Sequence, residues 1–334
     1  MKKYKVLAEY LDEAIREYEV KNCGMESGFK SKKRESPYEN YLSNDAWEKF
    51  YDDMARYNID ALKRYSDGSG GEMNSNENGS PPKMASFGSS SRMIYNLVMK
   101  DEVKERFLFE EKLSTTIGGI ANLDGFMQKG NTYIFVEAKC REPYSAKSND
   151  VKTAYCDLYA KITELTKLKC ECKPFIRKVK DKKPGEFKTV KMLDVTFKVD
   201  DKIINYFDMK QMICHLLAVG TAVLTNYYEE MNNTNDEDIK LHFIYLTYDP
   251  RNLNFEDAVK EKIENIYNDI FSFCNGNENQ FFKDLFKVIL EFLKSEKGLG
   301  DKAKERNISK IVDNFTFHTC SQEDFKKKCE SLLQ

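Results

Sequence analysis

The chain has 334 residues, 41% hydrophobic and 13% aromatic, so it can bury a sizeable core and lacks the composition of a disordered protein. Its formal net charge of −2 excludes a global basic field, so any contact with nucleic acid has to come from local patches. The longest apolar run, residues 212–224, is too short to span a bilayer and no apolar leader begins the chain, so we expect a cytoplasmic protein without a membrane partner.

The N-terminal part of the sequence predicts helices followed by a loop. Residues 3–22 and 46–65 have apolar positions at helical spacing. Residues 66–91 are rich in Gly, Ser and Asn, a composition typical of a loop. Ser91 is placed to cap a helix that runs over 92–99.

The pattern changes to strands at residue 107. Residues 107–113 alternate loosely between apolar and polar side chains. Residues 120–140 then predict two short apolar strands joined by a turn at Gly130–Asn131. Together these segments favour a three-stranded meander.

Three side chains of this hairpin are candidates for chemistry. Asp124 lies on its first strand, and Glu137 and Lys139 lie on its second. Side chains alternate along a strand, so Glu137 and Lys139 point to one face while Ala138 points away. Antiparallel pairing about the turn brings Asp124 towards Glu137, so two carboxylates and an amine are expected to converge.

The remaining segments alternate between helices and strands. In chain order, we expect a helix over 148–165, a lysine-rich segment over 167–191, an apolar helix over 207–224, a buried strand over 241–248, helices over 255–273 and 279–295, and a strand over 311–319.

The hairpin resembles the core motif of a known family. Asp124 followed by Glu137-x-Lys139 on a hydrophobic strand is similar to the motif of the PD-(D/E)XK nuclease superfamily, except that Leu123 stands where the motif has proline. Five segments resemble one uncharacterised bacterial branch of this superfamily: Lys83-Met-Ala-Ser-Phe-Gly-Ser-Ser-Ser91, Phe109-Glu110-x-x-Leu113, Gly118-Gly-x-Ala-Asn-Leu-Asp124-Gly, Lys139-Cys-Arg-Glu-Pro-Tyr144 and Gln211-x-x-x-His215-Leu216.

This resemblance covers residues 83–250 and implies an α/β fold of the restriction-endonuclease-like kind. Such a fold has a mixed central sheet flanked by helices, and here extra helices are expected at both ends. We expect one compact domain overall. Its parts are a helical region over 1–65, a loop over 66–91, a nuclease-like core over 92–250 and a helical extension over 251–334.

The residue types suit metal-dependent cleavage of a phosphodiester bond. Asp124 and Glu137 offer the hard oxygen ligands that Mg²⁺ prefers, with Mn²⁺ as an alternative, and the Ala138 carbonyl is a third candidate ligand. Lys139 would lie beside the attacking water and the phosphate, either as a base or as an electrostatic clamp. We therefore predict a metal-dependent nuclease, with a DNA endonuclease favoured.

Two further site residues are implied by the resemblance. Many members of the superfamily carry a glutamate upstream of the aspartate, and Glu110 fits that position, with Glu72 and Glu111 as rivals. The superfamily often places a glutamine on the later helix, facing the site, where this chain has Gln211. His215 lies one turn further on and could reach the same face, although a hydrogen-bonded core histidine is the simpler interpretation.

Basic residues could supply contacts to phosphate. Residues 167–191 contain ten Lys or Arg and three acids, which favours either a phosphate-binding segment or a solvated face. Phe175 and Phe187 are interleaved with them and could stack on bases or anchor the segment. We expect DNA as the partner in preference to RNA, and a homodimer would suit double-strand cutting. The candidate contacts are Lys83, Ser90, Arg92, Arg177 and Lys178.

Two other functions are compatible with the sequence. A non-catalytic nucleic-acid-binding or scaffold protein could keep this fold, although the complete set of Asp124, Glu137 and Lys139 favours catalysis. An RNA-directed or structure-specific nuclease would have the same metal site, so the motif does not separate it from a DNA endonuclease.

Overall fold

The structure is a computed structural model that describes residues 7–23, 27–29, 41–67, 72–74, 81–99, 102–145, 149–180, 187–296, 299, 303 and 305–334. Parts of four predicted segments lie outside the described residues. They are residues 3–6 of the first helix, residues 68–71 and 75–80 of the loop, residue 148 of the helix predicted over 148–165, and residues 181–186 of the lysine-rich segment.

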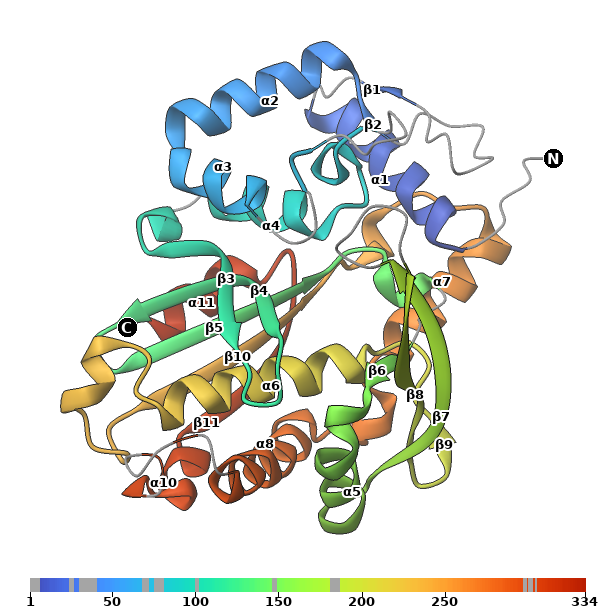
Figure 1. The fold of residues 1–334 in the computed structure, drawn as a ribbon. Coiled ribbons are helices and arrows are strands. Elements are labelled where there is room, and N and C mark those ends of the chain that lie inside the picture. The colour runs from blue at the N-terminus through green and yellow to red at the C-terminus, as the bar shows by residue number, and fades with distance from the viewer. Residues whose placement is uncertain are drawn as a thin grey trace.

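A five-stranded mixed sheet forms the centre of the molecule (Figure 1). Its order is β11-β10-β5-β4-β3; β3 and β5 run antiparallel to β4, and β10 runs parallel to both β5 and β11. The apolar run 133–136 is fully buried, as expected of a central strand. The predicted α/β class with a mixed central sheet is confirmed. The strands are β3 (Phe107–Ser114), β4 (Ile120–Lys129), β5 (Thr132–Lys139), β10 (Lys240–Thr247) and β11 (Phe315–Ser321).

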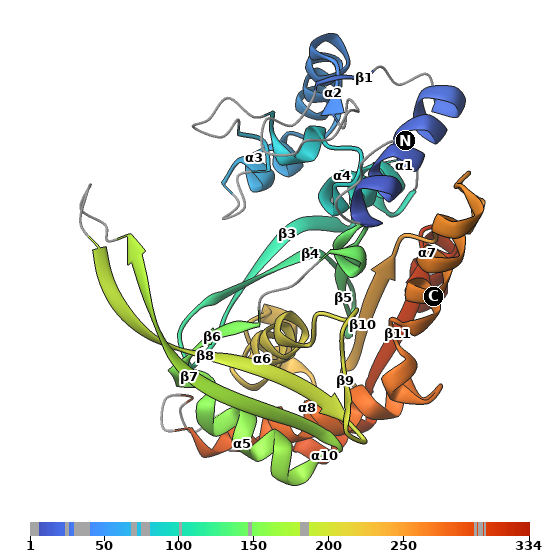
Figure 2. The same ribbon diagram turned by 90° about the vertical axis from the view of Figure 1, so that its right-hand side faces the viewer.

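Helices cover both faces of this sheet (Figures 1 and 2). Tyr133 and Phe135 pack with α5, α6 and α8 on one face, and Ile134 and Val136 pack with α1, α4, α7 and α11 on the other. No helix in the described part of the chain is long and apolar enough to cross a bilayer. The helices are α1 (Leu7–Cys23), α4 (Ser90–Met99), α5 (Cys156–Leu165), α6 (Met209–Leu224), α7 (Asp257–Asp269), α8 (Glu278–Ser295) and α11 (Phe325–Leu332).

The helix predicted over 46–65 is two helices, α2 (Asn44–Tyr57) and α3 (Ile59–Ser66). Asn58 separates them because its backbone is not helical and its side chain accepts a hydrogen bond of 2.9 Å from the Ala61 N–H. This is a helix N-cap, which asparagine favours. A short pair of strands, β1 (Ser27–Phe29) and β2 (Tyr41–Leu42), precedes α2.

The lysine-rich segment forms part of a long hairpin. β7 (Leu168–Lys180) and β8 (Phe187–Val199) pair along their whole length, and β6 (Asp150–Lys152) and β9 (Lys202–Ile203) pair with β8. We call β7 and β8 the arm. The helix predicted over 148–165 therefore begins later, at α5, because its first residues form β6.

The C-terminal segment is not purely helical. It contributes β11 to the central sheet, where Phe315 and Phe317 are buried. The strand predicted over 311–319 is displaced, since α10 (Ile308–Asp313) precedes it. The extension over 251–334, which was predicted to be helical, therefore also contains a strand of the central sheet.

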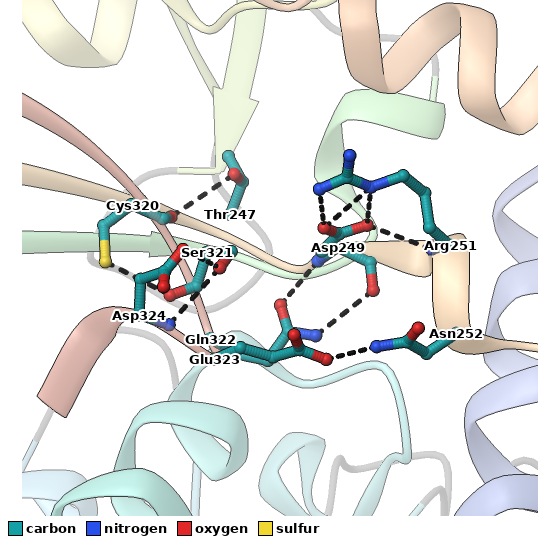
Figure 3. Close-up of polar contacts among 9 residues, drawn as sticks. All are labelled: Thr247, Asp249, Arg251, Asn252, Cys320, Ser321, Gln322, Glu323 and Asp324. Atoms are coloured by element: carbon teal, nitrogen blue, oxygen red, sulfur yellow. Dashed lines mark hydrogen bonds and ion pairs between the residues drawn. The ribbon is translucent and has the colours of Figure 1, made fainter. Parts of the chain in front are cut away.

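Polar contacts join the loops that follow β10 and β11 (Figure 3). The Asp249 N–H donates a hydrogen bond of 2.6 Å to Oε1 of Gln322, and Gln322 Nε2 donates one of 3.1 Å to the Asp249 carbonyl. Arg251 donates to the Asp249 carboxylate from its backbone and its guanidinium. These contacts fix two chain segments that are distant in sequence at one edge of the sheet.

Candidate active site

The strand ladder places Asp124 opposite Glu137. β4 and β5 pair from Lys129 with Thr132 to Gly125 with Val136, and the next position in this register sets Asp124 against Glu137. The regular ladder ends there. Asp124 Oδ2 instead accepts a hydrogen bond of 2.7 Å from the Ala138 N–H. The expected approach of the two carboxylate-bearing positions is therefore present.

Lys139 and His215 both contact the Glu137 carboxylate. Lys139 Nζ forms an ion pair with Oε1 of Glu137, and the two residues are only 6% and 1% exposed. His215, which is buried on α6, places Nδ1 3.2 Å from Oε2 of the same carboxylate. Sequence alone favoured a core histidine at this position, and the structure adds that it faces the candidate site.

The electrostatics separate the two carboxylates. Burial opposes ionisation of Glu137, but Lys139 and His215 outweigh it and lower the pKa of Glu137 to about 2. Burial, followed by the charge of Glu137, raises the pKa of Asp124 well above its usual range. Burial alone would lower the pKa of Lys139, yet Glu137 raises it. Glu137 and Lys139 therefore form an ion pair, whereas the charge of Asp124 lacks an equal counter-charge.

Glu110 lies opposite Asp124 on the neighbouring strand. The register of β3 and β4 pairs Phe109 with Gly125 and Glu111 with Leu123, which sets the Glu110 backbone beside Asp124, and the charge of Glu110 raises the pKa of Asp124. Its backbone has a φ of 51°, a conformation that non-glycine residues rarely adopt. Burial, with nearby Glu72 and Glu137, raises the pKa of Glu110 to about 7.

The two rivals of Glu110 are each paired with a basic side chain. Glu111 forms an ion pair of 3.2 Å with Arg64 and accepts a hydrogen bond of 3.3 Å from the Tyr228 hydroxyl. Glu72 forms an ion pair of 3.4 Å with Lys83. The structure therefore favours Glu110 as the third acid of the cluster.

α6 and β10 add side chains to the same region. Gln211 is half-buried in the first turn of α6, one turn before His215, and the two share a helix face. Tyr245 of β10 pairs in register with Glu137. Its hydroxyl is buried and has no hydrogen-bond partner among the described residues. The sequence did not single out Tyr245, because only the order of strands in the sheet places it beside Glu137.

Arg92 does not fit the predicted phosphate contact. Its side chain is 1% exposed, and its guanidinium donates hydrogen bonds to both oxygens of Glu19 and to the carbonyls of Ser86 and Phe87. This burial corrects the prediction, because no face of the guanidinium is left for a phosphate. The predicted cap is corrected as well, since Ser89 rather than Ser91 accepts a hydrogen bond from the Arg92 N–H.

Of the other four predicted contacts, Lys83 and Ser90 lie near the cluster and two lie on the arm. Lys83 lowers the pKa of Glu110, and Glu142, which Ser90 contacts, raises the pKa of Lys139. Ser90 donates a hydrogen bond of 2.9 Å to Glu142, and Lys83 is exposed. Arg177 and Lys178 are exposed on the arm, and Arg177 lies 3.3 Å from Asp150. A cavity of about 870 Å³ lies where the arm joins the body, lined by residues of β8 and by the segment before α6. The arm, rather than the region around Arg92, therefore presents exposed basic side chains.

The donor chemistry of the cluster suits a divalent cation. Asp124 and Glu137 supply carboxylate oxygens, and Glu137 Oε2 lies 3.2 Å from His215 Nδ1. The Ala138 N–H points to Asp124, so its carbonyl should face the same strand edge. However, no three His, Cys, Asp or Glu side chains in the described part are grouped to hold a metal ion. Binding would therefore require side chains to move, above all Lys139 away from Glu137.

Comparison of the chain with protein-family models, curated proteins and solved structures gave no match. Membership of the PD-(D/E)XK superfamily and the restriction-endonuclease-like fold therefore stay predictions. The mixed sheet and the cluster at the ends of β4 and β5 are observed directly.

Proposed function

We propose that this protein is a divalent-metal-dependent nuclease that hydrolyses phosphodiester bonds, and that it acts as an endonuclease on DNA. The observation that supports the proposal most is the meeting of Asp124, Glu137 and Lys139 at one buried strand end. Burying ionisable groups is costly, so such a cluster is typical of sites that bind or react.

Each residue has a role in this proposal. Asp124, Glu137 and the Ala138 carbonyl would hold Mg²⁺ or Mn²⁺, which when bound would stabilise charge on the phosphate as a Lewis acid. Lys139, released from Glu137, donates hydrogen bonds to a phosphate oxygen. Glu110, whose pKa is about 7, is suited to accept a proton from the attacking water near neutral pH.

Residues of α6 support this cluster. His215 orients Glu137, as outer groups orient the ligands of metal sites. Gln211, on the same helix face, is the candidate polar contact to the substrate.

A cleavage assay tests this function. The purified protein is incubated with plasmid, linear and single-stranded DNA, and with RNA, in Mg²⁺, Mn²⁺ or EDTA. We expect plasmid to be cut only when a divalent cation is present, and Lys139→Ala to abolish cutting. Lys240→Ala is the matched control, because Lys240 is exposed on the same sheet and pairs in register with Thr132, at the end of β5 far from Glu137. Cutting that survives both EDTA and Lys139→Ala would overturn the mechanism.

One observation supports a second function, that of a non-catalytic nucleic-acid-binding or scaffold protein. Both oxygens of Glu137 are faced by cationic or protonatable side chains, Lys139 and His215, which leaves the cluster without a ready three-ligand site. Binding of DNA without cutting of any substrate would favour this alternative. Cutting of RNA alone, or of branched DNA alone, would favour an RNA-directed or structure-specific nuclease. Light scattering of the same sample tests the homodimer that suits double-strand cutting.

A further inference from the structure

The arm is the most basic part of the described chain. β7 and β8 carry eight Lys or Arg and two acids, a net charge of +6 in a chain whose total is −2. The remainder of the chain is therefore acidic. Five of these basic residues, and neither of the acids, lie in residues 175–180 and 187–192, which we call the distal half of the arm.

The two halves of the arm have different surroundings. In the basal half, Leu168, Val195 and Phe197 are buried in the core that includes α5 and α6. In the distal half, Ile176 and Phe187 are 69% and 63% exposed. Figure 2 shows this half extending past the body of the molecule, clear of the helices. The distal half is thus held from its base and open to a partner along its length.

Basic side chains lie on both faces of the distal half. The register pairs Lys178 with Thr189 and Ile176 with Lys191, so Lys178 and Lys191 share one face. Arg177 pairs with Val190 and Val179 pairs with Lys188, so Arg177 and Lys188 share the opposite face. A ribbon that is basic on both faces is suited to a site with phosphates on two sides, rather than to a single flat anionic surface.

The dimensions agree with the major groove of B-form DNA. Two paired strands lie about 5 Å apart, and six residues of a strand span roughly 20 Å. The major groove is about 12 Å wide and about 8.5 Å deep, and it admits a two-stranded ribbon between its phosphate walls. The major groove of duplex RNA is too deep and narrow to be entered in this way.

We propose that the distal half of the arm inserts into the major groove of duplex DNA. Lys178 and Lys191 then face one phosphate wall, and Arg177 and Lys188 face the other. Ile176 and Phe187 lie on the same ribbon face as Lys178 and Lys191, so they approach the first wall. The inference rests on the proposed function in so far as it names the substrate of that same site as duplex DNA. The base of the arm packs on α5 and shares a buried core with α6, which carries His215 beside Glu137, so one core supports both the arm and the site.

Binding measurements in EDTA test the arm without cleavage. Fluorescence anisotropy compares a labelled DNA duplex, its single strand and the duplex RNA of the same sequence, for the full chain and two variants. The arm variant carries Arg177→Gln, Lys178→Gln, Lys188→Gln and Lys191→Gln. The matched control removes four exposed lysines from α7, α8 and α10: Lys260→Gln, Lys262→Gln, Lys287→Gln and Lys310→Gln.

We expect the wild-type chain to bind the DNA duplex most tightly. The arm variant should lose at least about tenfold in affinity, and the slope of log affinity against log salt should fall by about 3. The control variant should bind as the wild type does. Equal losses in both variants, no loss in the arm variant, or equal wild-type affinity for duplex RNA would overturn the inference.

Methylation of guanine N7 supplies an independent readout, because this atom lies in the major groove. The wild-type chain should protect N7 from dimethyl sulfate and the arm variant should not, with matching circular dichroism spectra showing that both are folded. Absence of wild-type protection would overturn groove insertion. If DNA binding depends on the arm but no substrate is cut with any metal, the proposed nuclease function is wrong and the role of the arm in binding stands. If DNA is cut and the arm substitutions change neither binding nor cutting, the nuclease function stands and the role of the arm is wrong.

Discussion

The carboxylates of Glu110, Asp124 and Glu137 lie in one region with Lys139 and His215. Lys139 and His215 keep Glu137 ionised, whereas burial raises the pKa of both Glu110 and Asp124. At the residue scale the site therefore holds one carboxylate with a lowered pKa and two with raised pKa values.

Glu110 gives a pH-dependent prediction for the metal-free protein. Its pKa is raised by burial from 4.5 to about 7, so its ionisation destabilises the fold as pH rises through that interval, and the cost is absent below about pH 4.5. Glu110→Gln removes this cost. We expect the variant to exceed wild type in stability by about 2 to 3 kcal/mol at about pH 8, and to match it at low pH.

Urea denaturation in EDTA at several pH values measures this difference. Glu111→Gln is the matched control. Glu111 lies on the same strand as Glu110 but forms an ion pair with Arg64, so loss of its charge should not increase the stability of the protein. A Glu110→Gln variant with the same stability difference at every pH would contradict the predicted ionisation.

His215 gives a prediction for the loaded site. His215→Leu removes the group beside Glu137, so the carboxylate loses its orientation, and we expect activity or metal affinity to fall about 10- to 100-fold. His215→Asn keeps a hydrogen-bond donor and should recover part of the loss. His242→Leu is the control, since His242 pairs with His318 between β10 and β11. Rates and Mg²⁺ titrations check the prediction, and equal losses at both histidines would count against it.

At the scale of elements, the β3–β4–β5 meander depends on a glycine at the site. Gly125 follows Asp124 directly, and a Cβ at this position would lie 2.0 Å from the Phe107 ring. That ring is buried against Phe109 and Phe325 and has little room to move. The close approach of the β3 side chain to the β4 backbone therefore requires glycine, and it fixes the strand that presents Asp124.

Gly125→Ala should consequently destabilise the protein by about 1 to 3 kcal/mol through overpacking. Phe107→Leu shortens the opposing side chain, so the double variant should recover part of the loss relative to the sum of the single changes. Chemical denaturation of the four proteins measures the coupling. Additive losses would show that the two residues do not meet as described.

At the scale of the whole molecule, Arg92 connects the N-terminal helix to the core. Its guanidinium joins Glu19 of α1 to the carbonyls of Ser86 and Phe87, just before α4, and lies 4.9 Å from the Phe87 ring. Since α4 and α1 pack over one face of the central sheet, this buried residue links segments that are far apart in the chain.

Arg92→Met should cost about 3 kcal/mol of stability, because two buried carbonyls and a carboxylate lose their donor. Glu19→Gln keeps acceptors and should cost less. Thermal or urea unfolding measures both changes, and DNA affinity of the folded protein should be unaltered. Full stability together with weakened DNA binding would restore Arg92 as a phosphate contact.

Local rules explain how much of the fold and site could be predicted. The turn at Gly130–Asn131 and the alternation of side chains around it fix the hairpin register, and with it the approach of Asp124 to Glu137. The apolar helix near 207–224 and the buried strand near 241–248 were also recognisable, because their apolar runs are long.

Sequence by itself therefore determined the α/β class, the hairpin and the three residues at its end. Only the tertiary structure placed His215 and Tyr245 beside Glu137, buried Arg92 against Glu19 and added β11 to the sheet. The physical reason is the separation in sequence of the residues that make each contact. Alternation and turns act between neighbours in the chain, whereas these contacts join distant segments whose relative position is set by packing of the whole core.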